Sequence, residues 1–195
     1  MTEQHRLSLR YKGEQIQEGM DPYVFAEAVR GFADLTYALH RNVYGDSSIE
    51  LRVERIAEGS WLVDFLMSLN SQQISTISSS FADLVVLAKE VFSLIQHLGG
   101  KQPQSREVVG GGKVNIVNYN GNQTIYNLHA ENIVLNQSGG KAAERFIRRP
   151  LMSEATALSV EFDGRSALDV DRTESESFVG LRSEEHLLES RGECW

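Results

Sequence analysis

The chain has 195 residues, of which 41% are hydrophobic and 24% are charged, and its 19 Lys and Arg against 27 Asp and Glu give a net charge of -8. That apolar fraction excludes a wholly disordered chain, so we expect a packed core. The acidic balance argues against a nucleic-acid partner, because proteins that bind the phosphate backbone usually carry a basic surface.

The compartment can also be predicted from the sequence. The single cysteine, Cys194, cannot form an internal disulfide, and residues 1–10 lack the basic-then-apolar order of a signal peptide. We therefore expect a cytoplasmic protein.

Charge is distributed unevenly along the chain. Residues 99–140 carry only three basic and two acidic residues, and this centre is rich in Asn and Gly. These shifts in composition divide the chain into an α+β module over residues 1–98, a flexible linker over 99–112, an Asn-rich β segment over 113–138, and a helix-strand remnant over 139–195 with a poorly ordered acidic tail.

The first region opens with a strand pattern, in which Leu7, Leu9 and Tyr11 alternate with polar residues. Asp21 then precedes Pro22, a pair typical of a helix start. Apolar residues recur at steps of three and four from there to the next glycine, which predicts an amphipathic helix of about six turns.

Two alternating segments follow, residues 49–54 and 61–68, and predict a hairpin. A second helical pattern runs from about Gln72 to Leu98, and charged residues interrupt it too often for a membrane span. The result is a β-α-β-β-α unit that packs two helices on one face of a three-stranded sheet.

The central segment carries the strongest turn signal, Asn120-Gly121, which favours a type I′ hairpin because both central residues of that turn need positive φ. Three similar dipeptides recur at spacings of nine and eight residues and suggest a repeated strand, either in a three-stranded meander or in one or two coils of a solenoid. The three dipeptides are Asn115-Ile116, Thr124-Ile125 and Asn132-Ile133.

The last region predicts a short helix from Lys141 to Arg149 that Pro150 halts, followed by a strand over residues 158–162. Beyond Gly164 the pattern weakens. Leu168 and Val170 could form a strand, whereas residues 174–195 have scattered apolar residues and much acidic charge, and there we expect a poorly packed tail.

Known catalytic patterns are missing from the sequence. Residues 110–113 read Gly-Gly-Gly-Lys but lack the remaining positions of a phosphate-binding loop. The five histidines lie far apart without Cys or carboxylate partners at ligand spacing. We therefore expect a non-enzymatic protein with no catalytic residue, no metal site and no cofactor. The polar face of the first strand, with Arg6, Arg10 and Lys12, is a candidate ligand or nucleic-acid contact.

The uncharged, Asn-rich strands suit stacking with copies of themselves, since Asn ladders satisfy their amides along a stack and no like charges repel. An intramolecular hairpin or meander is the alternative, and the sequence leaves both open. The candidate self-association residues are Asn115, Ile116, Asn118, Asn122, Thr124, Ile125, Tyr126, Asn132 and Ile133.

Four segments resemble an uncharacterised family of bacterial proteins associated with mobile elements: QEGMDPYVFAEAVRGFADLTYALHRNVYG, RIAEGSWLVDFLM, KVNIVNYNGNQTIYNL and AAERFIRRPL. The resemblance covers roughly residues 5–180. It implies structural motifs without established catalytic residues, and a chain that is shortened at its C-terminus relative to relatives that continue into a further β-rich domain.

The leading hypothesis is a non-enzymatic interaction protein that self-associates through the Asn-rich β segment, with itself or another protein as partner and with a role in mobile-element or phage-host conflict biology. The alternative is a small-ligand or nucleotide-binding module with its pocket between the three-stranded sheet and its helices. A third hypothesis, a hydrolase, has no motif behind it.

Overall fold

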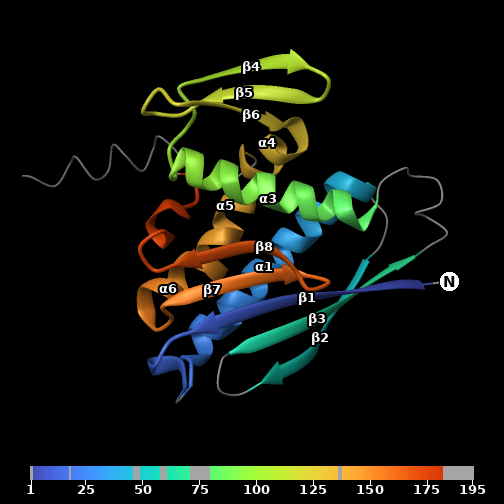
Figure 1. The fold of residues 1–195 in the computed structure, drawn as a ribbon, viewed down its shortest axis with the longest axis vertical. Coiled ribbons are helices and arrows are strands. Elements are labelled where there is room, and N and C mark those ends of the chain that lie inside the picture. The colour runs from blue at the N-terminus through green and yellow to red at the C-terminus, as the bar shows by residue number, and fades with distance from the viewer. Residues whose placement is uncertain are drawn as a thin grey trace, which may run out of the picture.

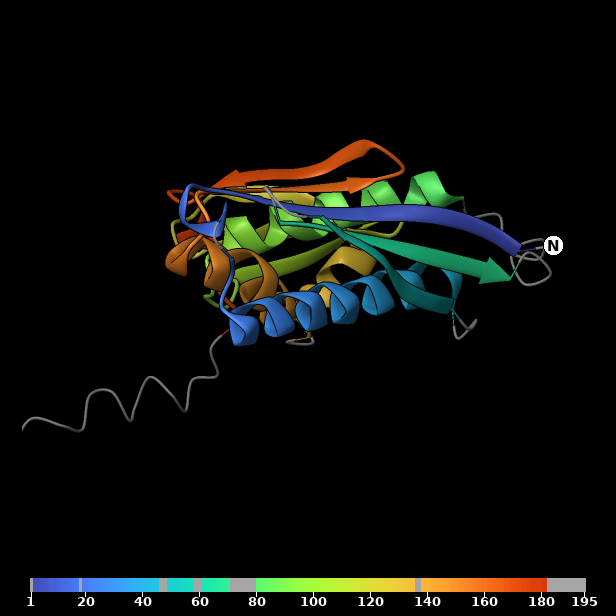
Figure 2. The same cartoon turned by 90° about the horizontal axis from the view of Figure 1, so that it is seen from below.

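The computed structural model describes residues 2–17, 19–45, 49–57, 61–70, 80–135 and 138–181. These form a mixed α+β fold with two antiparallel sheets (Figure 1), which confirms the predicted fold class. The larger sheet has the strand order β2-β3-β1-β7-β8 and the smaller one the order β4-β5-β6. The helices of the protein lie on one side of the larger sheet (Figure 2).

The N-terminal elements lie where the hydrophobic patterns predicted them. The Asp21 carboxylate accepts hydrogen bonds from the backbone N–H groups of Tyr23 and Val24, which satisfies the free donors of the first helical turn. The elements are β1 (Thr2–Lys12), α1 (Pro22–Tyr44), β2 (Ile49–Ala57), β3 (Leu62–Asn70) and α3 (Phe81–Leu98). The start of the second predicted helix, before residue 80, lies outside the described residues.

The larger sheet has five strands, so the prediction of three was wrong. β1 pairs with β3 on one edge and with β7 (Ala157–Phe162) on the other, and β8 (Arg165–Asp171) continues the sheet. Leu9, for example, lies between Val63 and Val160. The segment that we assigned to a separate remnant therefore completes the main sheet, because a local pattern shows that a strand forms but not which strand it pairs with.

The turn between β7 and β8 fastens this hairpin to β1. Asp163 and Gly164 have φ of 48° and 72°, as a two-residue type I′ turn requires. The Asp163 carboxylate accepts from the backbone N–H of Arg6 and is bonded to Nδ1 of His5, both at 2.7 Å. β8 thus forms in the range where Leu168 and Val170 left a strand open; of the tail that we expected from Glu174 onward, residues 182–195 lie outside the described part of the chain.

A helical path runs from residue 138 to residue 153 and passes through Pro150. It consists of α5 (Ser138–Ala143), a π-helical turn over Glu144–Arg148 and α6 (Arg149–Ser153). We expected Pro150 to halt the helix, but the proline lies in the first turn of α6, where a missing N–H costs no intrahelical bond. The Tyr11 hydroxyl donates to the carbonyl of Phe146 at 2.6 Å, which ties β1 to this path. Burial raises the pKa of Tyr11.

Aromatic side chains fill the space between the sheet and the helices. The ring of Phe32 on α1 lies 4.9 Å from that of Phe65 and 5.6 Å from that of Phe146, and Phe92 on α3 contacts the same Phe146 ring at 6.2 Å. All four side chains are buried. Such offset and edge contacts add to the stability that burial alone provides.

The smaller sheet occupies the centre of the sequence and lies over α3 and α4 (Figure 1). β4 falls inside the range that we predicted as a flexible linker, and Gly111 and Gly112, with φ of 59° and 71°, form its turn to β5. Asn132-Ile133 lies in a helix, so the third predicted strand repeat was wrong. The elements are β4 (Ser105–Gly110), β5 (Lys113–Val117), β6 (Gln123–Asn127) and α4 (Leu128–Leu135).

The hairpin between β5 and β6 has a longer loop than the predicted type I′ turn. The N–H of Gly121 donates to the carbonyl of Asn118, and that of Asn118 donates to the carbonyl of Asn122. Gly121 has φ of 80°, whereas Asn120 is not among the residues with positive φ. This is a type I turn followed by a left-handed glycine, the usual three-residue alternative.

Over the residues that the structure describes, every helix is too short or too polar to cross a membrane.

A first prediction concerns Gly31, where α1 passes close to α5. A Cβ at this position would lie 2.6 Å from the carbonyl oxygen of Ala142 and 2.7 Å from Cβ of Arg145. Gly31→Ala should therefore destabilise the protein by about 1–3 kcal/mol through overpacking, although the same change at an exposed helix site stabilises by about 1 kcal/mol. Urea unfolding measures the difference. Ala26→Gly, at an exposed site of the same helix, measures helix propensity alone, and a stabilising Gly31→Ala would contradict the close packing.

A second prediction concerns His40, which is buried on α1 with its ring centroid 5.0 Å from that of Tyr44. Burial lowers the pKa of His40 to about 4. In the unfolded chain this histidine has its ordinary pKa of about 6.5. Between about pH 4 and about pH 6.5, the unfolded chain therefore binds a proton that the folded protein does not. The free energy of unfolding should therefore fall as pH drops from about 6.5 to about 4, by up to about 3 kcal/mol from this residue.

The measurement is urea unfolding as a function of pH, compared with His40→Gln. Hydrogen bonds lower the pKa of carboxylates such as Asp169 and Asp171, and the protein also loses stability when acidification protonates them. The variant keeps those contributions and loses the histidine's. Identical pH slopes for the two proteins would show that His40 does not titrate as predicted.

Candidate functional site

β4 is an edge strand with all six residues exposed. In the described part of the chain it pairs with β5 alone, so the backbone groups along its outer edge have no strand partner. Val108 and Val109 are 57% and 49% exposed, so this edge also presents apolar side chains. An edge that exposes both backbone groups and apolar side chains can pair with another strand.

The strand is anchored to the body of the protein through Arg106. Its guanidinium donates to both carboxylate oxygens of Glu131 on α4, at 2.5 and 2.9 Å. Glu131 is almost fully buried, whereas half of the Arg106 side chain is exposed, and the carboxylate raises the pKa of Arg106. A bidentate pair of this kind fixes orientation as well as distance. β4 is therefore held in place although its outer edge is open.

Several predicted self-association residues are not on the surface. Ile116 and Tyr126 lie on the inner face of the smaller sheet, and Ile133 lies on α4, all of them buried in the core. The sequence predicted a hairpin in this segment, but the face that each residue occupies depends on α3 and α4 beneath the sheet. These three side chains serve the intramolecular fold.

Asn118 is also unavailable for an Asn ladder. Its Nδ2 donates to the carbonyl of His97 on α3 at 2.9 Å, and its Oδ1 accepts from the backbone N–H groups of Asn120 and Asn122, both at 3.0 Å. The side chain thus holds the hairpin loop together and fastens it to the end of α3. Only 7% of it is exposed.

The other predicted residues lie at or near the surface. Asn122, Thr124 and Ile125 are exposed, and Ile125 pairs across the ladder with the partly exposed Asn115. Asn132 on α4 is exposed and donates to the side chain of Asn42 on α1 at 3.2 Å. The structure therefore divides the predicted set between the core, the loop and the surface.

The predicted contact residues of β1 are spread along the larger sheet. Arg6, Arg10 and Lys12 are exposed, as the alternation with Leu7, Leu9 and Tyr11 indicated. Arg6 forms an ion pair with Glu54 on β2 at 3.1 Å. One of the three predicted cations thus already has an acidic partner on a neighbouring strand.

His5 is the described histidine with two carboxylates beside it. Its Nδ1 is bonded to Asp163, its Nε2 lies 3.1 Å from the Glu3 carboxylate, and its ring stacks on Phe81 with ring centroids 3.7 Å apart. Among residues 2–17, 19–45, 49–57, 61–70, 80–135 and 138–181, no group of three or more His, Cys, Asp or Glu is arranged to hold a metal ion.

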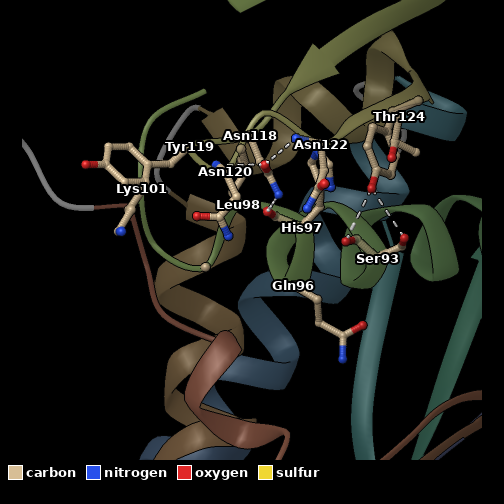
Figure 3. A pocket seen from close by; sticks show the side chains of 12 residues that line it. Ser93, Gln96, His97, Leu98, Lys101, Asn118, Tyr119, Asn120, Asn122 and Thr124 are labelled. Carbon is tan, nitrogen blue, oxygen red and sulfur yellow. Dashed lines mark hydrogen bonds between the residues drawn. The ribbon is translucent and has the colours of Figure 1, made fainter. Parts of the chain in front are cut away.

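A surface pocket of about 600 Å³ lies between the C-terminal turns of α3 and the β5–β6 hairpin (Figure 3), and we call it the hairpin pocket. Gln96 and His97 line it from the helix, and Tyr119, Asn122 and Lys101 line it from the loop and from the segment after the helix. The alternative hypothesis predicted a pocket elsewhere, between the expected three-stranded sheet and its helices. The hairpin pocket was missed because its two walls are distant in sequence.

No protein-family model matches this chain, and comparisons with curated proteins and with solved structures likewise found no match. The candidate sites therefore depend on the geometry described above.

A third prediction tests the anchor of β4. Arg106→Ala should release the strand from α4 and leave the buried Glu131 carboxylate without its partner. Amide hydrogens of residues 105–110 should then exchange several-fold faster by mass spectrometry, because the strand opens locally. Glu107→Ala, which alters the neighbouring exposed residue of the same strand, is the matched control. Unchanged exchange in Arg106→Ala would show that the ion pair does not hold β4.

Proposed function

We propose that this protein is a non-enzymatic interaction protein that self-associates through its smaller sheet, with β4 as the contact strand. The observation that carries the proposal is the edge of β4, which is fully exposed and bears Val108 and Val109. A role in mobile-element or phage-host conflict biology belongs to the same proposal and depends on the sequence resemblance alone.

The sequence of β4 is compatible with antiparallel pairing to a second copy. When a two-fold axis perpendicular to the sheet passes through Val108, Val108 lies opposite its own copy, Glu107 lies opposite Val109, and Arg106 lies opposite Gly110. No like charges then face one another, whereas like charges directly opposite destabilise a strand pair. This register covers the exposed valines and extends three strands to six.

The low charge around this edge also supports the proposal. Residues 99–140 carry three basic and two acidic residues, so two copies of this region approach each other with little of the repulsion that a net charge of -8 would otherwise produce. Two natural defences of edge strands are nevertheless present: charged residues, and a register shift between Val108 and Gly110. We therefore expect weak association.

The structure decides which variants can test this. Deleting residues 113–136 would remove Val114 and Ile116 from the core, and Asn118→Asp would disrupt the hairpin loop. A loss of assembly in such variants could reflect unfolding. Point changes on the exposed edge of β4 avoid this problem.

A fourth prediction follows. The wild-type protein, with a chain mass of 21.8 kDa, should show a concentration-dependent increase in mass by size-exclusion chromatography with light scattering at tens of micromolar. Val108→Lys should remain monomeric, because the added like charges face each other across the axis. Val86→Lys is the control, since Val86 is equally exposed, at 56%, but lies on α3.

Two outcomes would contradict the proposal. A wild-type protein that stays at its monomer mass over the whole range would exclude self-association. A wild-type oligomer that Val108→Lys leaves intact would show that the copies associate through another surface.

A further inference from the structure

The hairpin pocket has walls that are fixed by hydrogen bonds. Gly99 ends α3 in a left-handed conformation, with φ of 54° and ψ of 39°, and its N–H donates to the carbonyl of Ile95. The opposite wall is the β5–β6 loop, which Asn118 fastens to the carbonyl of His97. Because both walls are held in this way, the pocket is formed before any ligand arrives, as is usual for small-molecule sites.

Two uncharged amides of the loop are free to bind a ligand. The side chains of Asn120 and Asn122 are exposed and make no hydrogen bond to another described residue, whereas the side chain of Gln96 points away from the loop (Figure 3). Each amide offers both a donor and an acceptor. Asn and Gln side chains use this pairing to bind the edges of nucleobases, adenine in particular.

An exposed aromatic ring stands at the mouth of the pocket. Tyr119 is 66% exposed, and Nζ of Lys101 lies 3.9 Å from its ring centroid. Figure 3 shows these two side chains together at one end of the group of amides. A base can stack on an exposed aromatic ring, and a cation beside the ring can neutralise the phosphate attached to that base.

The electrostatics of the pocket limit the charge of the ligand. Lys101 is the only cation among the residues that line it. The pocket also lies at the C-terminus of α3, where the free carbonyls give the helix dipole its negative end. A phosphate monoester carries a charge of about -1.5 to -2 at pH 7, which one lysine balances in part. A triphosphate would place further negative charge against these carbonyls.

We propose that the hairpin pocket binds a nucleoside monophosphate. The base stacks on Tyr119, the amides of Asn120 and Asn122 hydrogen-bond its edge, and Lys101 pairs with the phosphate. The volume of about 600 Å³ falls in the ordinary range for pockets that take ligands of this size.

The test is isothermal titration calorimetry of the full chain with AMP, GMP, CMP and UMP, with adenosine, ATP and ribose 5-phosphate as comparison ligands. At least one monophosphate should bind, and more tightly than its triphosphate or ribose 5-phosphate. Tyr119→Ala should weaken binding roughly 5- to 150-fold, the usual range for loss of one stacked base. Tyr23→Ala is the matched control, because Tyr23 is also exposed, at 82%, and lies on α1.

Lys101→Ala separates the roles of the base and the phosphate. It should weaken the monophosphate that binds but leave the matching nucleoside unchanged, since the nucleoside has no phosphate. The proposal is overturned if no monophosphate binds at low millimolar concentration, if ribose 5-phosphate binds as tightly as the monophosphate that binds, or if Tyr119→Ala weakens binding no more than Tyr23→Ala does. Circular dichroism of each variant confirms that it remains folded.

Discussion

The fold depends on the pairing of β1 along both of its edges. Its apolar residues, such as Leu9 between Val63 and Val160, connect strands that are about 150 residues apart in sequence. The hydroxyl of Tyr11 then ties the same strand to the helical path at Phe146. Because this one strand joins the first and last parts of the chain, the central segment must leave the main sheet and return to it.

The smaller sheet is separate from the larger one. The segment after α3 forms a meander over α3 and α4 and does not pair with a strand of the larger sheet. Val114 and Ile116 bury its inner face, and Arg106 attaches its edge strand through Glu131. The β4 edge and the hairpin pocket are therefore both held by contacts to these helices, on the part of the chain with the least charge.

The two proposed sites use different physical properties of the same sheet. β4 offers backbone groups and apolar side chains along an open edge, which suits a second strand. The β5–β6 loop offers a fixed aromatic ring and unpaired amides over a helix end, which suits a small planar ligand. Neither site needs the perturbed acids and bases of a catalytic centre. His40, whose pKa is lowered by burial, is buried against Tyr44 on α1 and belongs to neither site.

The sequence by itself determined the local elements: the capped helix after Asp21, the alternation of β1, and a hairpin at Gly121, because periodicity and turn chemistry act between neighbouring residues. It also determined the weak charge of the centre. Only the tertiary structure decided that β7 and β8 complete the larger sheet, that Asn132-Ile133 is helical, and that Asn118 holds a loop rather than a ladder. These outcomes depend on which distant surfaces meet, and strand pairing and burial against α3 and α4 outweigh the local preference of a short polar segment.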